Sequence, residues 1–435
     1  MNLRGRNMSK IRYLIYGSIV VGIFVILHLI FPRTLSNWLQ WTDQLFSGTN
    51  PGHLALFIPG VAVFIIFVFL YGINFFASFG KPKYPDGSEN FQPDISVIIP
   101  AKDEEKIIGE TLESYVKSKY PKDKLELIVV ASDSTDKTVE ICQSYQDRLT
   151  LKILTEPLPK KGKPAALNLG LKHASHEVLC IFDADTQVQE NSLLYLVRHL
   201  YNPDISAVQG PIQVRNWNIN KLTKALTLDF AYFITGAGLY ADIRNHLGRT
   251  LWIVGRNYCI RKKVMEEIGG WNEDSLAEDM HLTVQLAMLK KQVRYAPDAL
   301  CSETVPTDFE SFKHQRQRWV AGYSQGMDAV MKLDVRTVLL RNFGMLHYGH
   351  MGNYALAFLV ATFLVGFIAK DLYVTLLCII TCIFIFGQFV NALRKYGNGR
   401  YRVLLYYPIY FVCIFYMFYV QFTKKEGLEW DKTQK

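Results

Sequence analysis

Short apolar runs alternate with amphipathic segments through the middle of the chain. The runs are rich in Val, Ile and Leu and have the length of strands, and the segments between them repeat apolar residues with helical spacing. The predicted strands cover residues 94–100, 125–130, 151–154 and 177–182, and the predicted helices cover residues 104–117, 135–145 and 163–174. This alternation predicts an α/β fold in which helices flank both faces of a mostly parallel sheet.

Longer apolar runs lie on either side of this region. They cover about residues 11–31, 54–79, 343–369, 372–393 and 403–422. Their lengths suit the roughly 20 residues that a helix needs to cross a bilayer. The sequence therefore predicts an N-terminal transmembrane hairpin and a group of C-terminal transmembrane or interfacial helices, with the α/β domain between them.

The distribution of Lys and Arg predicts how these segments are oriented. Four cations lie before or at the start of the first run, and Lys81 and Lys83 follow the second, so both ends of the hairpin are expected in the cytoplasm. A cleaved signal peptide is the competing interpretation, but the charge-poor loop before the second run favours a retained hairpin. The basic loop 394–402 should also be cytoplasmic. The Lys-rich tail then conflicts with three full crossings, so one C-terminal run is expected to be re-entrant or interfacial.

Composition agrees with a membrane protein that carries a soluble domain. The 435 residues are 50% hydrophobic and 20% charged, with a mean hydropathy of +0.08. The formal net charge is +9. Because the cations cluster beside apolar runs, they indicate membrane topology, and no nucleic-acid partner is predicted. The seven cysteines show no spacing typical of a metal site or a disulfide framework.

Polar clusters follow three of the predicted strands. Residues 102–105 follow the first strand, residues 132–136 follow the second, and Asp183 and Asp185 follow the strand at 177–182. Ligands of open parallel sheets bind beyond the carboxyl ends of the strands. Carboxylates two residues apart can hold a hard divalent cation against phosphate oxygens. Taken singly, each cluster could also be a turn or a helix cap.

Three further segments could contribute to the same site. Lys163 opens a predicted helix, where a cation and free backbone N–H groups could meet a diphosphate. Glu278 and Asp279 begin a helix and either complement its dipole or supply a general base. Gln315, Arg318 and Trp319 fall within about one turn of a predicted helix at 308–327. There Arg can hold phosphate and Trp can stack on a sugar ring, or they can form a membrane-interface cluster.

Taken together, these segments resemble the membrane-bound family 2 glycosyltransferases. This family includes poly-N-acetylglucosamine, hyaluronan and cellulose synthases and ceramide glucosyltransferase. The segments that carry the resemblance are Val97-Ile98-Ile99-Pro100-Ala101, Asp133, Lys163 with Ala166-Leu167-Asn168, Asp183-Ala184-Asp185, Glu278-Asp279 and Gln315-Arg316-Gln317-Arg318-Trp319. The ordered set covers about residues 95–322, and it is far more specific than any one of its parts.

The resemblance implies a GT-A nucleotide-binding domain, a UDP-sugar donor and a Mg²⁺ or Mn²⁺ ion. The implied roles are metal binding by Asp185, donor or nucleotide binding by Pro100, Glu104, Asp133, Lys163 and Asp183, catalysis by Asp279 as the base, and acceptor or diphosphate binding by Gln315, Arg318 and Trp319. The sequence departs from the family pattern in two places. Ser132-Asp133-Ser134 replaces a common Asp-Asp-Gly, so Asp136 is a rival to Asp133, and Lys102-Asp103-Glu104 replaces a common Tyr-Asn-Glu.

The resulting hypothesis is an inverting, metal-dependent glycosyltransferase of the plasma membrane that extends a β-linked polysaccharide. Transfer of one sugar to a lipid acceptor is the first alternative. A catalytically inert nucleotide-binding or glycan-export protein is the second, but Asp185, Asp279 and Arg318 are all present. The predicted domains are a transmembrane hairpin at 1–80, a linker at 81–93, a cytoplasmic GT-A domain at 94–330, transmembrane or interfacial helices at 331–423, and a polar tail at 424–435.

Overall fold

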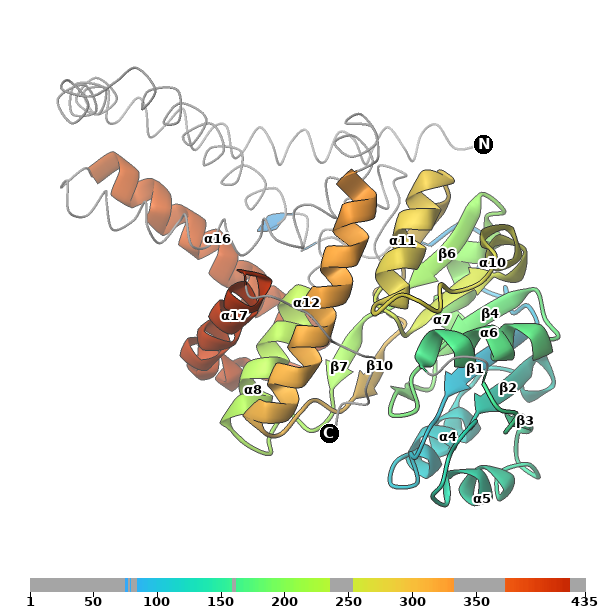
Figure 1. Ribbon diagram of the computed structural model, residues 1–435. Helices are drawn as coiled ribbons and strands as arrows, with labels where there is room; N and C mark the ends of the chain where they lie inside the picture. The colour runs from blue at the N-terminus through green and yellow to red at the C-terminus, as the bar shows by residue number, and fades with distance from the viewer. Residues whose placement is uncertain are drawn as a thin grey trace. The chain divides into compact units, whose positions relative to one another are not determined.

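The computed structural model describes residues 75–76, 79, 84–158, 162–234, 253–331 and 372–422. The chain divides into two compact units. One unit comprises residues 1–80 and 346–392, and the other comprises residues 81–345 and 393–435. The second unit holds both sheets and every predicted site residue, and Figure 1 shows its strands and helices.

A seven-stranded mixed sheet forms the centre of the second unit. Its strands, in spatial order, are β3 (Thr150–Leu154), β2 (Leu125–Val130), β1 (Ile95–Pro100), β4 (Val178–Ile181), β8 (Tyr258–Arg261), β6 (Ile205–Gln209) and β9 (Gln292–Tyr295). The first four are parallel, β8 is antiparallel to both of its neighbours, and β9 is parallel to β6. The carboxyl ends of β1, β2 and β4 therefore meet at one edge, as the sequence predicts.

A second, three-stranded sheet lies beyond the end of β4. Its spatial order is β5 (Gln187–Val188), β10 (Cys301–Glu303) and β7 (Ile212–Val214). β10 is antiparallel to β5 and parallel to β7. The small sheet matters for function because β10 ends at Glu303, which it brings beside the residues that follow β4.

The helices of the second unit have the following bounds. They are α4 (Ile108–Lys117), α5 (Thr138–Gln143), α6 (Lys163–His173), α7 (Ser192–Arg198), α8 (Lys221–Leu228), α10 (Lys262–Ile268), α11 (Glu278–Met288), α12 (Phe309–Met331) and α17 (Tyr407–Phe422), with short 3-10 turns η1 (Lys122–Lys124), η2 (His199–Tyr201) and η5 (Tyr401–Tyr406) and a π-helical turn η3 (Asp229–Ile234).

Helices cover both faces of the parallel part of the sheet. Ile95, Val97 and Ile99 of β1 join the core cluster that contains buried residues of α4. Ile98 points to the opposite face, where it contacts α6 at Gly170 so closely that a Cβ on this glycine would collide with it. Successive strand residues face opposite ways, so the continuous apolar sequence of β1 reflects burial on both sides.

The sequence predicts the four parallel strands to within about a residue at each end, but it places two helices too early. α4 begins at Ile108 rather than residue 104, because Asp103 has a left-handed φ of 53° and the N–H groups of residues 103–105 bond to side chains of the loop after β2. α5 begins at Thr138 rather than residue 135, because the carboxylate of Asp136 accepts a hydrogen bond from the Thr138 N–H. Both differences arise where two loops bond to each other.

The C-terminal apolar runs are helical where the structure describes them. α16 (Leu372–Tyr396) covers the run predicted at 372–393, and η5 with α17 covers the run at 403–422. Among the described residues, no helix is both long enough and apolar enough to cross a membrane. The runs predicted at 11–31, 54–79 and 343–369 lie outside the described residues, apart from residues 75, 76 and 79. Their membrane insertion stays a prediction.

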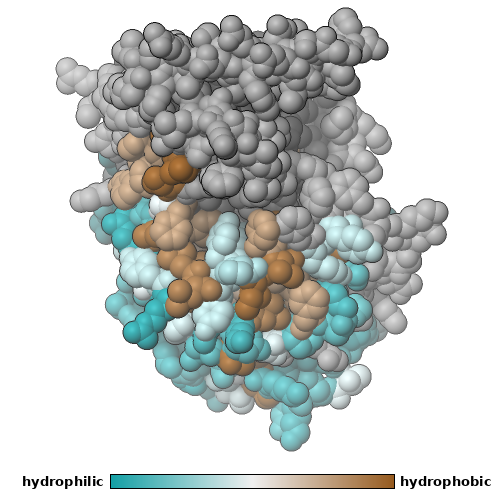
Figure 2. All heavy atoms as spheres, turned by 90° about the vertical axis from the view of Figure 1, so that its left-hand side faces the viewer, coloured by the Kyte–Doolittle hydropathy of each residue, from teal (hydrophilic) through white to brown (hydrophobic). Residues whose placement is uncertain are grey.

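α17 has one face against the domain and another that is exposed. It packs against α8 and α12, with Tyr410 and Cys413 buried (Figure 1). Leu405 of η5 and Val412 and Tyr419 of α17 are 80%, 57% and 63% exposed. Their seven-residue spacing places Val412 and Tyr419 on one side of the helix. Figure 2 shows hydrophobic residues gathered on the described part of this side of the molecule, next to hydrophilic ones.

Close packing fixes α12 against the start of α11. A Cβ on Gly322 of α12 would meet the backbone nitrogen of Ala277 at 2.8 Å and would collide with the Ala277 side chain. Ala277 directly precedes Glu278 and Asp279. The glycine therefore sets the distance between the helix that carries Trp319 and the candidate base.

We expect Gly322→Ala to lower the free energy of unfolding by about 1–3 kcal/mol, because the backbone of Ala277 cannot move aside as a flexible side chain could. Gly109→Ala in α4 is the matched control, since its Cβ would make an ordinary contact at 3.5 Å with Ile141. That control should be neutral or stabilising by up to about 1 kcal/mol, because Ala favours helices. Denaturant unfolding measures both changes, and equal stability of the two variants would contradict the packing argument.

Candidate active site

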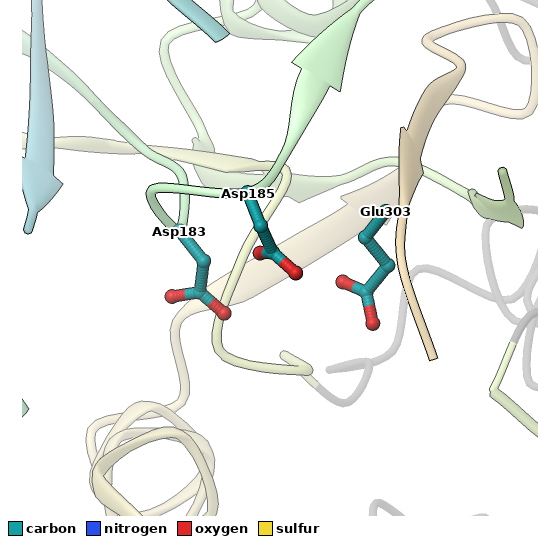
Figure 3. A group of neighbouring side chains, drawn as sticks. All are labelled: Asp183, Asp185 and Glu303. Carbon is teal, nitrogen blue, oxygen red and sulfur yellow. The ribbon is translucent and has the colours of Figure 1, made fainter. Parts of the chain in front are cut away.

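Three carboxylates converge at the carboxyl end of β4. Asp183 and Asp185 leave this strand, and Glu303 comes from β10 of the small sheet (Figure 3). Their oxygens lie within 4.8 Å of one another. Asp185 and Glu303 are buried, whereas Asp183 is partly exposed. The Ala184 carbonyl between the two aspartates accepts a hydrogen bond from the Thr111 hydroxyl at 2.6 Å, which fixes this turn to α4.

Lys163 connects the carboxylate of Asp183 to that of Glu278. Its Nζ lies 2.7 Å from Asp183 Oδ1 and 2.9 Å from Glu278 Oε1, and it donates a hydrogen bond of 2.9 Å to the Gly255 carbonyl. Burial lowers the pKa of this ammonium, but Asp183 and Glu278 more than offset that effect, so the pKa is raised overall. Lys163 is therefore a permanent cation that joins the β4 edge to the start of α11.

Arg256 is a second buried cation in the site. Its Nε and Nη2 donate to the two oxygens of Glu303 at 2.6 and 2.7 Å, and Nε lies 3.8 Å from Asp183 Oδ2. Burial lowers the pKa of the guanidinium, but Glu303, Asp183 and Asp185 more than offset that effect, so the pKa is raised overall and the group stays charged. Sequence reasoning missed both Arg256 and Glu303, because they come from distant segments and belong to no short motif.

Asp279 lies at the first turn of α11, close to Lys163. The Met280 N–H donates to its Oδ1 at 2.8 Å. A Cβ on Gly255, which has a φ of +70°, would lie 3.1 Å from Asp279 Oδ2 and 3.4 Å from Lys163 Nζ. Burial and the negative charge of Glu278 raise the pKa of Asp279 to about 6, although Lys163 opposes them. Such a carboxylate is ionised at neutral pH and binds a proton far more readily than an ordinary Asp.

The loops after β1 and β2 form one connected structure beside this cluster. The hydroxyl of Ser134 donates to the Ala101 carbonyl and accepts from the Asp103 N–H, and Asp103 Oδ1 accepts from the Thr135 N–H at 2.7 Å. The Glu104 N–H donates to the Thr138 hydroxyl at 2.7 Å. Pro100, at the end of β1, is partly exposed at the base of this structure.

The two rival acids of the second loop have different surroundings. Asp136 accepts hydrogen bonds from the N–H groups of Glu105 and Thr138 and from the Thr138 hydroxyl. Its carboxylate therefore holds the two loops together. Asp133 has a left-handed φ of 59°, and its side chain is exposed. Asp133 is thus the acid of this pair that a ligand can reach.

α12 carries the motif at residues 315–319, and it places Trp319 near the carboxylate cluster. Trp319 is partly buried, and the Arg256 guanidinium lies 5.7 Å from the centre of its ring. Arg318 is also partly buried. Gln315 is 4% exposed, and its Oε1 has no hydrogen-bond partner among the described residues. A buried acceptor of this kind calls for a ligand or a water molecule.

The donor set fits a hard divalent cation. Asp183, Asp185 and Glu303 offer carboxylate oxygens, which Mg²⁺ and Mn²⁺ prefer. With Glu278 and Asp279 nearby, carboxylates outnumber the two cations Lys163 and Arg256 in this cluster. The excess negative charge and the spacing of the oxygens are both compatible with a divalent metal.

The structure thus brings together most of the residues that the sequence singled out. Lys163, Asp183, Asp185 and Asp279 form one connected cluster, and Trp319 reaches it through Arg256. Pro100, Glu104, Asp133, Gln315 and Arg318 lie on the loops and the helix that surround this cluster. The binding roles of all these residues stay predictions.

The chain matches known glycosyltransferases in sequence. The family described as glycosyl transferase family group 2 matches residues 178–390. A probable glycosyltransferase, YdaM of Bacillus subtilis (strain 168), is 33% identical over 253 residues, which cover 55% of this chain and 57% of that protein.

Two further relatives have more specific names. A poly-beta-1,6-N-acetyl-D-glucosamine synthase of Staphylococcus epidermidis is 29% identical, and the match covers 52% of this chain and 54% of the relative. A beta-monoglucosyldiacylglycerol synthase of Nostoc sp. (strain PCC 7120 / SAG 25.82 / UTEX 2576) is 28% identical, with coverage of 65% and 60%. The chain thus spans between about half and three fifths of the length of these curated relatives.

The fold also has a solved counterpart. A mannosyltransferase from Pyrobaculum calidifontis, in complex with GDP-Man and Mn²⁺, superposes with a TM-score of 0.53 and 22% identity, covering 83% of this chain and 96% of that one. At 22% sequence identity, this similarity shows a shared fold and nothing more specific. The family match, the relatives and the GT-A fold together support a glycosyltransferase enzyme.

We expect Lys163→Met to lower the free energy of unfolding by about 3–5 kcal/mol, because it leaves buried carboxylates without their cation. The loss should be greater at pH 8 than at pH 5. Lys163 lowers the pKa of Asp279, so its removal raises that pKa further above the unfolded value, and the folded state loses stability as pH rises toward the new pKa. Denaturant unfolding at both pH values measures the effect.

Lys117→Met is the control for this prediction. Lys117 is 69% exposed, and its Nζ lies 3.8 Å from Glu113, so its loss should change stability little at either pH. A Lys163→Met variant that behaves like Lys117→Met would show that the cluster does not depend on this ammonium.

Proposed function

We propose that the protein is an inverting glycosyltransferase that transfers sugar from a UDP-sugar to a growing β-linked polysaccharide. The observation that supports this proposal most is the placement of Asp279, a carboxylate with a raised pKa, close to Lys163, which pairs with Asp183 after β4. A base next to a site for a nucleotide diphosphate is what transfer to a hydroxyl requires. The family match and the poly-N-acetylglucosamine synthase relative support this choice.

The proposed reaction is a single displacement. Asp279 accepts the proton of an acceptor hydroxyl, whose oxygen forms a bond to the anomeric carbon of the donor. The bond from that carbon to the diphosphate oxygen breaks, and UDP leaves on the opposite side. An α-linked donor thereby gives a β-linked product.

The other residues bind and orient the two substrates. Asp133, Pro100 and Glu104 would contact the nucleotide, and Gln315, Arg318 and Trp319 would contact the acceptor and the diphosphate. A Mg²⁺ or Mn²⁺ ion held by Asp185, with Asp183 and Glu303 beside it, would neutralise the charge of the leaving diphosphate. Lys163 holds Asp183 and Glu278 in place, and so it orients the donor side and the base together.

Transfer of one sugar to a lipid is the second candidate. The beta-monoglucosyldiacylglycerol synthase relative favours it, and it matches a larger share of this chain than the poly-N-acetylglucosamine synthase relative does. The same base and the same carboxylates would serve a lipid hydroxyl. The two candidates differ in the acceptor and in the number of sugars added.

Both candidates act at the cytoplasmic face of the plasma membrane in this proposal. The exposed side chains of Leu405, Val412 and Tyr419 would enter the interfacial region of the bilayer, and exposed Arg394 and Arg402 lie close to them in sequence. Apolar and aromatic side chains with nearby cations suit a surface of anionic lipids. The apolar runs at 11–31, 54–79 and 343–369 would anchor the chain.

Purified protein should release UDP from one member of a panel of UDP-sugars in the presence of Mn²⁺, and excess EDTA or Asp185→Ala should abolish the release. Mass spectrometry of the products separates the candidates. Long glycans made from donor alone support the polysaccharide, whereas a single sugar on added diacylglycerol supports the lipid acceptor. Undiminished turnover in EDTA would contradict the metal assignment, and no turnover with any UDP-sugar would contradict the proposed donor.

Asp279→Asn should lower turnover by about 10²–10⁴-fold with donor affinity kept, because it removes the proton acceptor and preserves size and polarity. In the wild type, kcat/KM should fall as pH drops below about 6, where Asp279 binds a proton. The residual activity of Asp279→Asn should lack this acid limb. Asp274→Asn is the control, because Asp274 is exposed. This variant should keep the wild-type turnover and the fall of kcat/KM at low pH. Loss of donor binding in Asp279→Asn would instead assign this residue to substrate binding.

A further inference from the structure

A further buried ion pair, apart from the carboxylate cluster, lies beside Trp319, and the reaction as proposed does not use it. Arg316 of α12 is 1% exposed, and its Nη2 pairs with Oδ2 of Asp229, which is 4% exposed. Asp229 begins the π-helical turn η3 at the end of α8. π-Helical turns occur frequently at functional sites.

Stability alone does not explain this pair. The desolvation of two buried charges offsets most of their attraction, and well-packed apolar residues often serve equally well. Arg316 Nε also lacks a hydrogen-bond partner among the described residues. Burial of a guanidinium with an unpaired N–H group costs more free energy than an apolar contact between the same two helices would. This cost indicates that Arg316 has a role in the active site.

The guanidinium of Arg316 lies against the indole of Trp319. The distance from its central carbon to the ring centre is 4.3 Å, and the distance to the ring of Phe312 is 5.2 Å. Residues 312, 316 and 319 fall on one face of α12, because they are four and three positions apart. Arg256 contacts the same indole from the carboxylate cluster. Trp319 is thus in contact with two buried guanidinium groups, each held by its own carboxylate.

We propose that Arg316, held by Asp229, is a positioning residue that fixes the Trp319 ring for stacking against the acceptor. This inference rests on the proposed function. It gives a role to Arg316 and Asp229, for which neither the sequence motif nor the proposed reaction provides one. A planar cation within contact of the ring restricts the orientation of the indole, and Asp229 restricts the cation in turn. The expected consequence is specific: loss of the pair impairs acceptor use and leaves the donor site intact.

The test is a double replacement, Asp229→Leu with Arg316→Met. Apolar residues of similar size can replace a buried ion pair without loss of the fold, so the double variant separates positioning from stability. We expect wild-type stability, unchanged UDP binding, an acceptor KM raised at least tenfold, and a larger share of donor lost to hydrolysis. The acceptor probe is a β-linked N-acetylglucosamine oligosaccharide or diacylglycerol in vesicles, whichever the wild type glycosylates.

A second readout follows the ring directly. The fluorescence of Trp319, obtained by subtracting a Trp319→Phe form of each protein, should become more accessible to acrylamide in the double variant. Lys313→Met, which removes a cation from an ion pair near the surface of the same helix, is the control and should leave quenching and acceptor KM unchanged. Unchanged quenching and an acceptor KM within twofold of the wild type would assign the pair to folding alone.

Two outcomes require a further measurement: a double variant that does not fold, and a wild type that transfers no sugar to either acceptor probe. If the double variant does not fold, Arg316→Lys keeps the charge but loses the planar group, and we expect an acceptor KM raised at least fivefold with a folded protein. Wild-type values in Arg316→Lys would overturn the proposal. If the wild type transfers no sugar to either probe, the proposed function fails, while the quenching and UDP-binding measurements still test whether Arg316 orients Trp319.

Discussion

Two buried cations, Lys163 and Arg256, hold the carboxylates of the site together. Lys163 pairs with Asp183 and Glu278, and Arg256 pairs with Glu303 and approaches Asp183 from its other oxygen. Each carboxylate, if unpaired, would carry a desolvation cost of several kcal/mol, so the cations allow this density of negative charge beneath the surface. Because Asp183 contacts both, the two cations and their carboxylates form one network that joins five separate segments of the chain.

The network lies next to the contact between α11 and α12. Glu278 opens α11 and is fixed by Lys163, while Ala277 before it lies against Gly322 of α12. The position of Trp319 on α12 relative to the base on α11 is thus defined by the close packing of Gly322 against Ala277. Donor side, base and aromatic residue are held by different elements, yet each is one or two contacts from Lys163 or Arg256.

Much of the fold could be predicted from the sequence, because it rests on local patterns. β1 and β2 are continuous apolar runs bounded by polar residues, and both match their predicted bounds to within a residue. The late start of α4 could not be predicted, because it depends on hydrogen bonds that the N–H groups of residues 103 and 104 donate to Ser134 and to Thr138 at the start of α5. Within the site, the carboxylates Asp183, Asp185 and Asp279 could be identified from their places at strand and helix ends, whereas the pair of Arg256 and Glu303 became evident only from the fold.

The missed residues share a physical reason. Glu303 ends a three-residue strand, and its sequence gives no indication that an arginine nearly fifty residues earlier neutralises it. Arg316 lies inside a recognised motif, but only the fold shows that it faces Asp229 in the core rather than solvent. Short motifs locate groups that contact substrate, since their spacing reflects one strand end or one helix face. The oppositely charged partners of buried residues, such as Glu303 for Arg256 and Asp229 for Arg316, come from segments that are distant in the sequence.

The same network explains why the proton affinity of Asp279 is set by more than its own burial. Burial and Glu278 raise its pKa, and Lys163 lowers it, so the value reflects a balance of opposing effects. The ammonium that lowers it also binds Asp183 at 2.7 Å. A ligand that competes for Asp183 therefore alters the electrostatic environment of Asp279 through a single Nζ atom. In this arrangement the donor side and the base are electrostatically linked, and the link requires no change in the backbone.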